Sequence, residues 1–256
     1  MRRQSESVLI RNEGLVDRIG QIKSDHPFWG YRRMWAYLKY VDGLTVNKKR
    51  IYRLMKEHNL TVRPNQKLIA KRLSNRRKPR PDRPGQWWGI DMTKVITDSG
   101  WVYVVIVLDW YSKKIVGHYS GRQATSGHWL EALEMGLNGQ FPDGVRGHDL
   151  HLMSDNGSQP TSLRFMKACS SLKVDQTFTS YNNPKGNADT ERMMRTLKEE
   201  LFWLREWPGE TELTKELDRW IEYYNESYLH SALGYRPPNK VEEIYNLSRK
   251  TLLKSA

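Results

Sequence analysis

Apolar residues recur at helical spacing in the first part of the chain. Three helices are expected there, at about 6–23, 31–40 and 48–58, each with one apolar stripe. Asn47 is placed to cap the third helix, because its side chain can accept a hydrogen bond from the first helical turn. Short helices joined by a tight turn are the plan of a helix-turn-helix module, so residues 1–62 are predicted to form a small all-α domain.

The period changes from helix to strand at about residue 86. Three hairpin strands followed by alternating helices and strands are typical of a ribonuclease-H-like fold, by analogy of element order. We therefore predict an α/β core at 86–226, with a mixed five-stranded sheet and flanking helices. A tail at 227–256, made of loop and short helix, is expected to pack on this core. The expected elements are strands at 86–96, 101–108, 114–120, 150–154 and 174–178, and helices at 126–138, 160–172, 188–204 and 211–225.

The formal net charge of the 256 residues is +13, and it is confined to the front third. Residues 1–85 hold 22 Lys and Arg against 7 Asp and Glu, whereas the remaining residues hold 20 and 22. The stretch 63–85 is basic, proline-rich and without periodicity, so we expect an extended linker that can lie along phosphates. Charge segregated in this way is typical of proteins that bind a polyanion. The alternative is a solvated surface that only keeps the protein soluble.

A basic stripe is predicted on the third helix. Lys49, Arg53 and Lys56 recur at i, i+4 and i+7 and therefore share one face. In a helix-turn-helix module the later helix enters the major groove, so these residues are predicted to contact DNA. The alternative is an ordinary three-helix module whose charges are only solvated. Three further DNA contacts are predicted in the linker, at Arg76, Arg77 and Lys78.

Several classes of protein are excluded by composition. The single cysteine, Cys169, excludes an intrachain disulfide and any multi-cysteine zinc site. The longest purely apolar run, 101–108, is far shorter than the ~20 residues that span a bilayer. Arg2 and Arg3 are not followed by an apolar run, so we see no secretory signal. We expect a cytoplasmic protein with no membrane partner.

Three carboxylates are the candidate catalytic and metal-binding residues. Asp91 lies within the first strand, Asp155 follows the fourth, and Glu191 lies on a helix after 35 intervening residues. Acids make up 29 of the 256 residues, so the spacing alone carries little weight. In phosphodiester transfer the nucleophile must be activated and the charge on the phosphate must be neutralised. Two Mg²⁺ (or Mn²⁺) ions held by two or three carboxylates can do both. Asp109 is the strongest rival, and Asn187 or Asp189 is expected to cap the helix, which makes a cap the expected role of Asp189.

Glu191 is predicted to share its helix face with two cations. Arg195 and Lys198 follow it at i+4 and i+7, away from the apolar stripe. We assign Arg195, Lys198 and Lys185 in the preceding loop to DNA phosphate. The alternative for Glu191 and Arg195 is an ordinary helix ion pair worth a few tenths of a kcal/mol.

These residues resemble a known group. Asp91-Met92-Thr93, Ser154 to Ser158, and Asn183-Pro184 leading to Glu191 and Lys198 resemble the DDE core of retroviral integrases and bacterial transposases. The segments His26 to Arg33 and Tyr224 to Tyr235 resemble the downstream-frame transposases of the insertion sequence three group. The chain departs from that group at Tyr228, where arginine is common.

The resemblance implies a fold, an activity and partners. The fold would be a ribonuclease-H-like integrase core, and the activity metal-dependent cleavage of DNA 3′ ends followed by strand transfer, for transposition of an insertion sequence. The partners would be the element's terminal inverted repeats, target DNA, further copies in a synaptic complex, and an upstream-frame protein or fusion. The protein would be associated with the bacterial nucleoid when bound to DNA.

Two other functions remain open at this stage. A non-catalytic DNA-binding accessory protein would keep the core only as a scaffold, and intact acids at all three positions argue against it. A ribonuclease-H-type nuclease would share the fold and metals without joining ends. The basic front module and the pair Arg195 and Lys198 disfavour that function.

Overall fold

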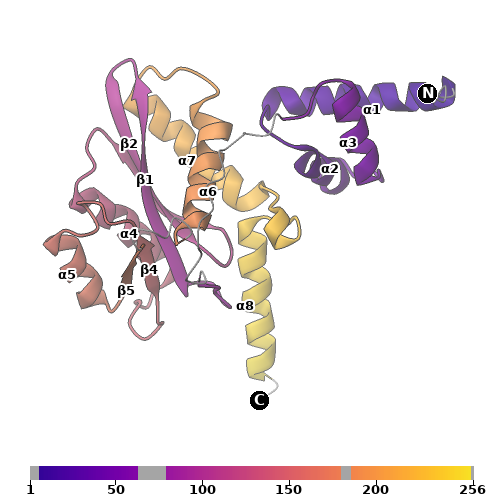
Figure 1. The fold of residues 1–256 in the computed structure, drawn as a ribbon. Helices are drawn as coiled ribbons and strands as arrows, with labels where there is room; N and C mark the ends of the chain where they lie inside the picture. The colour runs from indigo at the N-terminus through magenta and orange to yellow at the C-terminus, as the bar shows by residue number, and fades with distance from the viewer. Residues whose placement is uncertain (1–5, 63–78, 180–185, 255–256) are drawn as a thin grey trace, which may run out of the picture. The chain divides into compact units, whose positions relative to one another are not determined.

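The computed structural model describes residues 6–62, 79–179 and 186–254 (Figure 1). The chain divides into two compact units, one of Met1–Lys71 with Leu229–Tyr235, and one of Arg72–Tyr228 with Arg236–Ala256. Four of the predicted DNA contacts lie outside the described residues, namely Arg76, Arg77, Lys78 and Lys185. No described helix has the length and apolar character needed to cross a bilayer.

The first unit is built on the three predicted helices. They are α1 (Glu6–Asp25), α2 (Tyr31–Tyr40) and α3 (Lys48–Glu57), and all three confirm the sequence pattern to within two residues. Asn47 caps α3 as expected, since its side-chain oxygen accepts a hydrogen bond of 2.8 Å from the Lys49 amide. Their shared core consists of buried residues that include Ile19, Ile22, Trp29, Met34, Leu38, Ile51, Leu54 and Met55.

A short segment from the far end of the chain completes this unit. The Tyr235 ring lies edge-on to Trp35, with centroids 5.3 Å apart, and stacks on Tyr40 at 6.1 Å. The Lys48 ammonium lies 4.0 Å from the Trp35 ring centroid. Residues 227–256 were expected to form a tail on the core, whereas Leu229–Tyr235 belong to the unit of the three helices.

The second unit is organised by the five-stranded sheet that the sequence predicted. Its strand order is β3-β2-β1-β4-β5 (Figure 1). The antiparallel pairs are β1–β2 and β2–β3, and the parallel pairs are β1–β4 and β4–β5, so the mixed sheet is confirmed. The strands are β1 (Trp87–Thr97), β2 (Gly100–Asp109), β3 (Ile115–Gly121), β4 (His151–Ser154) and β5 (Asp175–Phe178).

Helices cover both faces of this sheet. Trp88 and Ile90 of β1 pack with α4 (Ser126–Gln140) and α5 (Leu163–Leu172) in the main hydrophobic core. Successive strand residues point to opposite faces, so Gly89 and Asp91 point the other way. There α6 (Ala188–Leu197) lies against β1, and α7 (Glu210–Ser227) lies against β3.

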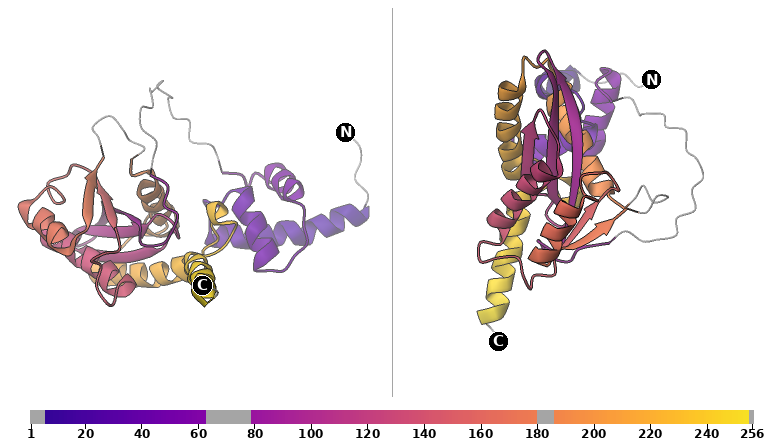
Figure 2. Two further views of the ribbon diagram at one scale, coloured as in Figure 1. Left: turned by 90° about the horizontal axis from the view of Figure 1, so that it is seen from below. Right: turned by 90° about the vertical axis from the view of Figure 1, so that its left-hand side faces the viewer.

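The tail differs from the expected loop and short helix. It contains a 17-residue helix, α8 (Pro238–Lys254), which packs on α7 and extends beyond the sheet in the right-hand view of Figure 2. Proline is favoured in the first turn of a helix, so Pro238 is a starting signal that the sequence analysis did not use. An ion pair of 2.6 Å between Lys114 and Glu242 ties α8 to the start of β3.

The prediction of one α-helix at 188–204 was wrong for the second half of this range. α6 ends at Leu197 and continues as a π-helical turn, η1 (Lys198–Phe202). The wider turn inserts extra backbone and rotates the following residues about the axis. Phe202, the last residue of this turn, is buried, whereas Leu204 lies beyond the helix and is 42% exposed.

Asp109, the rival carboxylate, holds the sheet end together. It is 2% exposed, and its oxygens accept hydrogen bonds from the Gly85 amide at 2.7 Å and the Trp88 indole at 3.1 Å. The Ser112 amide and hydroxyl donate at 2.8 and 2.9 Å. Burial raises the pKa of Asp109, and these hydrogen bonds oppose the rise. With its oxygens occupied by four donors, Asp109 has a structural role.

Replacing Asp109 should therefore weaken folding. Asp109→Ala leaves several buried donors without an acceptor, which we expect to cost about 3 kcal/mol in the free energy of unfolding. Urea denaturation measures this cost, with Asp109→Asn as a milder second variant. The exposed Asp143→Ala is the control and should change stability by less than about 0.5 kcal/mol. Equal stability of Asp109→Ala and the control would contradict the structural role.

Candidate functional site

Asp91 lies at the centre of an electrostatically coupled group. Its carboxylate accepts a hydrogen bond of 2.8 Å from the Met92 amide. Burial raises the pKa of Asp91 to about 6 against this hydrogen bond, and the charges of Asp155 and Glu191 raise it further. The charge of Lys198 lowers the pKa. Coulombic effects of this kind fall off with distance, so the three carboxylates and Lys198 share one region.

The strand register places Asp155 beside Asp91. β1 and β4 are parallel neighbours, and Gly89 pairs with Met153. Asp91 and Asp155 each follow two residues later, so Asp155, directly after the end of β4, lies level with Asp91 in the middle of β1. Asp155 is exposed, and its Oδ1 accepts a hydrogen bond of 3.0 Å from the Gly157 amide. The loop thus holds the carboxylate at the carboxyl end of β4.

Glu191 reaches this place because α6 lies unusually close to β1. A Cβ atom at Gly89 would lie 1.9 Å from the Thr190 hydroxyl and 2.5 Å from the Trp110 indole nitrogen. Only glycine permits the contact, and the Trp110 indole donates a buried hydrogen bond of 3.0 Å to Thr190 across it. Thr190 directly precedes Glu191, so the contact fixes the first turn of α6 against the strand that carries Asp91.

An ion pair holds the same helical turn. Lys113 lies on the loop that follows β2, and its ammonium nitrogen is 2.9 Å from Oδ2 of Asp189. Of the two expected caps of α6, Asn187 occupies the cap position and Asp189 does not, although the Asn187 side chain makes no capping hydrogen bond. Asp189 instead anchors the helix through Lys113, and both are partly buried.

The two cations predicted beside Glu191 behave differently. Lys198 influences Asp91, as expected of a residue facing the site. The Arg195 guanidinium pairs with Glu199 at 2.7 Å, one turn further along the helix, so the alternative of an ion pair between Arg195 and Glu191 is not formed among the described residues. An exposed pair of this kind contributes at most about 1 kcal/mol and is readily exchanged for a phosphate.

The carboxylates suit a divalent cation by their chemistry. Asp91, Asp155 and Glu191 offer oxygen ligands, which Mg²⁺ and Mn²⁺ prefer, and their mutual repulsion would be relieved by positive charge. Within the residues that the structure describes, no three His, Cys, Asp or Glu side chains are already close enough to enclose one ion. The three acids are therefore gathered in one region without a closed ligand shell.

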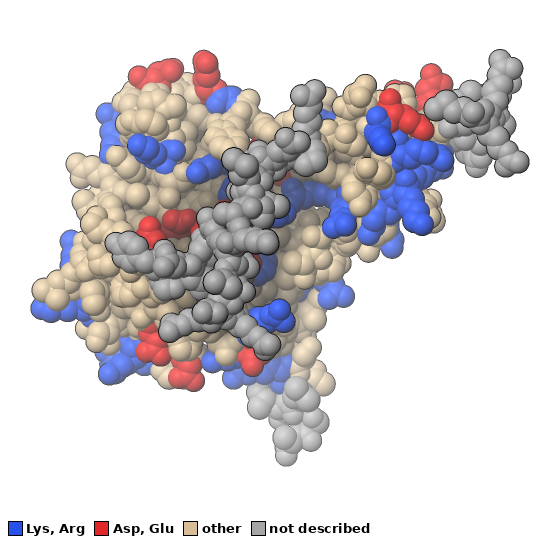
Figure 3. All heavy atoms as spheres, in the orientation of Figure 1, with Lys and Arg blue, Asp and Glu red and all other residues tan. Residues whose placement is uncertain are grey.

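The basic stripe on α3 is presented to solvent. Lys49, Arg53 and Lys56 are all exposed, and Ile51, Leu54 and Met55 are buried behind them, as the sequence predicted. Lys and Arg side chains gather over this unit in Figure 3. Arg53 forms only a loose ion pair, 3.8 Å from Glu57.

The sequence analysis missed the residues that position Glu191. Gly89 stands two residues before Asp91, and Thr190 stands directly before Glu191. A glycine within a strand is a signal of close backbone approach, so Gly89 was detectable in principle. Trp110 and Lys113 gave no such signal, because their partners on α6 are about eighty residues away in sequence.

Tyr228, the departure from the expected arginine, is a packing residue. Its side chain is 1% exposed, and its hydroxyl donates a hydrogen bond of 2.9 Å to Glu200. A ring in this position cannot reach a phosphate in solution without leaving the core.

Known proteins match this chain along most of its length. Residues 10–67 match a family described as HTH-like domain, and residues 81–184 and 172–238 match two families described as Integrase core domain. The transposase for insertion sequence element IS629 of Shigella sonnei is 27% identical over 93% of this chain and 82% of its own length. The transposase InsD for insertion element IS2 of Escherichia coli is 25% identical over 87% of this chain and 76% of its own.

A solved structure shares the fold. A chain of the simian T-cell lymphotropic virus intasome, in complex with the PP2A regulatory subunit B56 gamma, aligns with a TM-score of 0.52 at 16% identity. The alignment covers 81% of this chain and 73% of that one.

The contact at Gly89 can be tested by adding one methyl group. Gly89→Ala should push α6 from β1 and lower the free energy of unfolding by about 2–3 kcal/mol through overpacking. Chemical denaturation measures the change. Gly139→Ala is the matched control, because nothing lies within 4 Å of its added Cβ, and it should be neutral or stabilising by about 0.5 kcal/mol. If both variants unfold alike, α6 does not depend on Gly89.

The burial of Asp91, together with the nearby charges of Asp155 and Glu191, predicts a stability cost that depends on pH. The pKa of Asp91 in the fold, about 6, lies above its ordinary value of 3.8, so ionising it opposes folding. The cost is absent below pH ~4, grows as the pH rises and is complete above pH ~6. In metal-free buffer at pH 7.5, Asp91→Asn should therefore be more stable than the unaltered protein by about 1–3 kcal/mol.

Thermal unfolding across pH 4 to 8 checks this expectation. The gain from Asp91→Asn should shrink toward zero at the acid end of the series. Asp143→Asn, which alters an exposed carboxylate, should show no such trend. A gain for Asp91→Asn that is constant across the series would contradict a raised pKa of Asp91 in the fold.

Proposed function

We propose that this chain cleaves DNA 3′ ends and transfers them to target DNA during transposition of an insertion sequence. The chain belongs to the transposases and retroviral-type integrases that have an integrase core. The observation that carries the proposal is the convergence of Asp91, Asp155 and Glu191 from β1, the end of β4 and α6. Carboxylates on three elements of one sheet region are what metal-assisted phosphoryl transfer requires.

We assign the three carboxylates as the ligands of two divalent ions, Mg²⁺ or Mn²⁺. When bound, such ions would neutralise charge on the phosphate and lower the pKa of the attacking water or hydroxyl group, which makes it a better nucleophile. Asp91 is the most constrained of the three, since it lies mid-strand and is partly buried. Asp155 and Glu191 are exposed and can adjust to DNA. This combination suits one fixed ligand and two adaptable ones.

The remaining groups bind and orient the DNA. Lys198 is placed to hold a phosphate next to the carboxylates, and Arg195 can join it by giving up Glu199. The amide of Gly157 secures Asp155, and the missing side chain there leaves room for the DNA backbone. Positioning of this kind supplies much of the rate in phosphoryl transfer, because the protein itself forms no bond to DNA.

The two chemical steps balance without an energy source. In the first, a water oxygen bonds to phosphorus while the bond to the DNA 3′ oxygen breaks, and that oxygen leaves as a 3′-hydroxyl. In the second, this hydroxyl oxygen attacks a target phosphorus, and the target's own 3′ oxygen leaves with the proton. Each step exchanges one phosphorus–oxygen bond for another.

We assign DNA recognition to the first unit. The exposed stripe of Lys49, Arg53 and Lys56 on α3 has the arrangement of a recognition helix, with phosphate contacts to either side. The element's terminal inverted repeats are the proposed ligand, target DNA is the second substrate, and several copies of the chain would assemble on the ends. A protein from an upstream reading frame, separate or fused, is the further proposed partner.

The catalytic assignment predicts a clean loss of joining. Asp155→Asn and Glu191→Gln change exposed side chains, so we expect folded proteins that bind DNA normally but do not join ends. Labelled oligonucleotides copied from the DNA flanking the gene are incubated with plasmid and Mg²⁺ or Mn²⁺, and joined products are separated on gels.

The control variants make the same change from carboxylate to amide at residues that are not proposed metal ligands. Asp175→Asn and Glu134→Gln alter exposed carboxylates outside the proposed ligand set and should leave joining intact. Mg²⁺ should also raise the melting temperature of the unaltered protein, and much less that of Asp155→Asn. Metal-dependent joining by either catalytic variant would defeat the assignment.

A further inference from the structure

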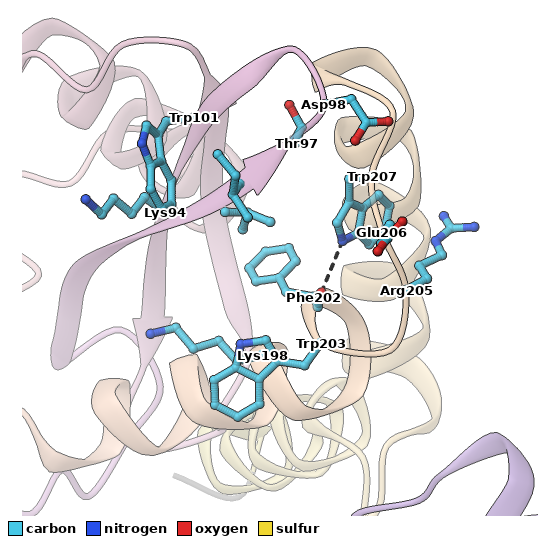
Figure 4. Close-up of a pocket in the computed structure, with 12 residues that line it drawn as sticks. Lys94, Thr97, Asp98, Trp101, Lys198, Phe202, Trp203, Arg205, Glu206 and Trp207 are labelled. Atoms are coloured by element: carbon cyan, nitrogen blue, oxygen red, sulfur yellow. Dashed lines mark hydrogen bonds between the residues drawn. The ribbon is translucent and has the colours of Figure 1, made fainter.

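A cavity of about 440 Å³ lies between the β1–β2 hairpin and the end of α6, next to the carboxylate site (Figure 4). Its volume is in the range of small-ligand sites. Its main walls are formed by Lys94, Trp101, Lys198, Phe202, Trp203 and Trp207. The catalytic assignment leaves every one of these residues except Lys198 without a role.

The walls of this cavity are fixed by hydrogen bonds. The Asp98 amide at the hairpin turn donates to the Trp207 carbonyl at 2.9 Å. The Trp207 indole, 2% exposed, donates to the Phe202 carbonyl at 3.2 Å, as the dashed line in Figure 4 shows. The loop after η1 is therefore fastened to the hairpin, and the cavity is preformed.

Two tryptophans at this cavity are held in contact with water. Trp203 is 60% exposed and Trp101 is 46% exposed. Trp203 is the residue at which the π-helical turn η1 ends, and it is exposed whereas Phe202 directly before it is buried. Exposing a large aromatic ring is unfavourable in water, so a flat ligand that stacks on it would gain binding energy.

Two lysines supply positive charge at the same place. The Lys94 ammonium lies 4.3 Å from the Trp101 ring centroid. Lys94 and Lys198 extend the same way from opposite walls in Figure 4, while Asp98 and Glu206 lie at the other end. Across the described residues, neither lysine forms an ion pair with a carboxylate, whereas Arg205 is engaged by Glu212 and Glu216.

Lys198 connects the cavity to the carboxylates. It lines the cavity and also lowers the pKa of Asp91. It follows Glu191 by seven residues, which is ~10 Å along a helix axis. That distance corresponds to roughly three nucleotides of a stacked strand. A strand whose phosphate lies at the carboxylates therefore has nearby nucleotides within reach of the cavity.

We propose that this cavity binds an unpaired nucleotide of the DNA end, with its base stacked on Trp203 and its phosphate between Lys94 and Lys198. A base within a duplex has both faces covered by its neighbours, so only a base that has left the stack can use the tryptophan. Aromatic faces beside cations are the usual means of holding single-stranded DNA. The proposal rests on the proposed function, since it requires that DNA occupy the neighbouring carboxylate site.

Binding of two matched DNA probes tests this proposal. One probe is a blunt duplex, and the other is the same duplex with two unpaired terminal nucleotides, one of them 2-aminopurine. Both are titrated into the full chain carrying Asp155→Asn, without metal, so that no reaction occurs. Anisotropy gives the affinity, and quenching of 2-aminopurine reports stacking of the unpaired base.

We expect the unpaired probe to bind about tenfold more tightly than the blunt one, which is typical of stacking one base on an aromatic ring. Adding Trp203→Ala should abolish this preference and the quenching while leaving binding of the blunt duplex unchanged. Trp203→Phe should keep most of both, and Lys94→Ala should weaken the preference. Lys167→Ala, an exposed lysine on α5, is the control for charge and should not alter the preference.

Three results would overturn the proposal. They are a preference that survives Trp203→Ala, an equal loss of affinity for both probes, and a change in the molecular mass of the assembly without any effect on the preference. The last would make the cavity an interface between proteins. The proposed function fails separately, if the unaltered protein does not join ends, because the binding measurement requires no joining.

Discussion

The close approach of α6 to β1 is the constraint on which the site depends. Gly89 removes the side chain that would block it, and the hydrogen bond between Trp110 and Thr190 closes the contact from the other side. The ion pair between Lys113 and Asp189 secures the same helical turn. Glu191 is thereby presented to Asp91, and Lys198 is brought between the carboxylates and the neighbouring cavity.

This arrangement gathers negative charge where the fold alone would avoid it. Burial raises the pKa of Asp91, and Asp155 and Glu191 raise it further, so ionisation of Asp91 opposes folding at neutral pH. The sheet tolerates the cost because its core, built around Trp88, Ile90 and the apolar faces of α4 and α5, is extensive. Asp109 differs from these three carboxylates, because hydrogen-bond donors surround both of its oxygens and its role is structural.

Much of the fold was accessible from the sequence, because local patterns determine it. The change of period near residue 86, the apolar central strand and the Asn47 cap all describe neighbours in sequence. The convergence of Asp91, Asp155 and Glu191 was inferred from the order of strands and helices. The turn at η1, the exposure of Trp203 and the docking of Tyr235 on Trp35 were not accessible, since each depends on contacts between distant segments. The same holds for Trp110, which acts through Thr190.

The central claim is that Asp91, Asp155 and Glu191 together hold the metal ions that carry out the reaction. Anomalous diffraction from crystals grown with Mn²⁺ and a DNA end tests it most directly, because manganese is located independently of the protein atoms. The account predicts two manganese peaks about 3.5–4 Å apart, with oxygens of all three side chains as ligands. Manganese bound without Asp91, or only at other acids, would contradict it.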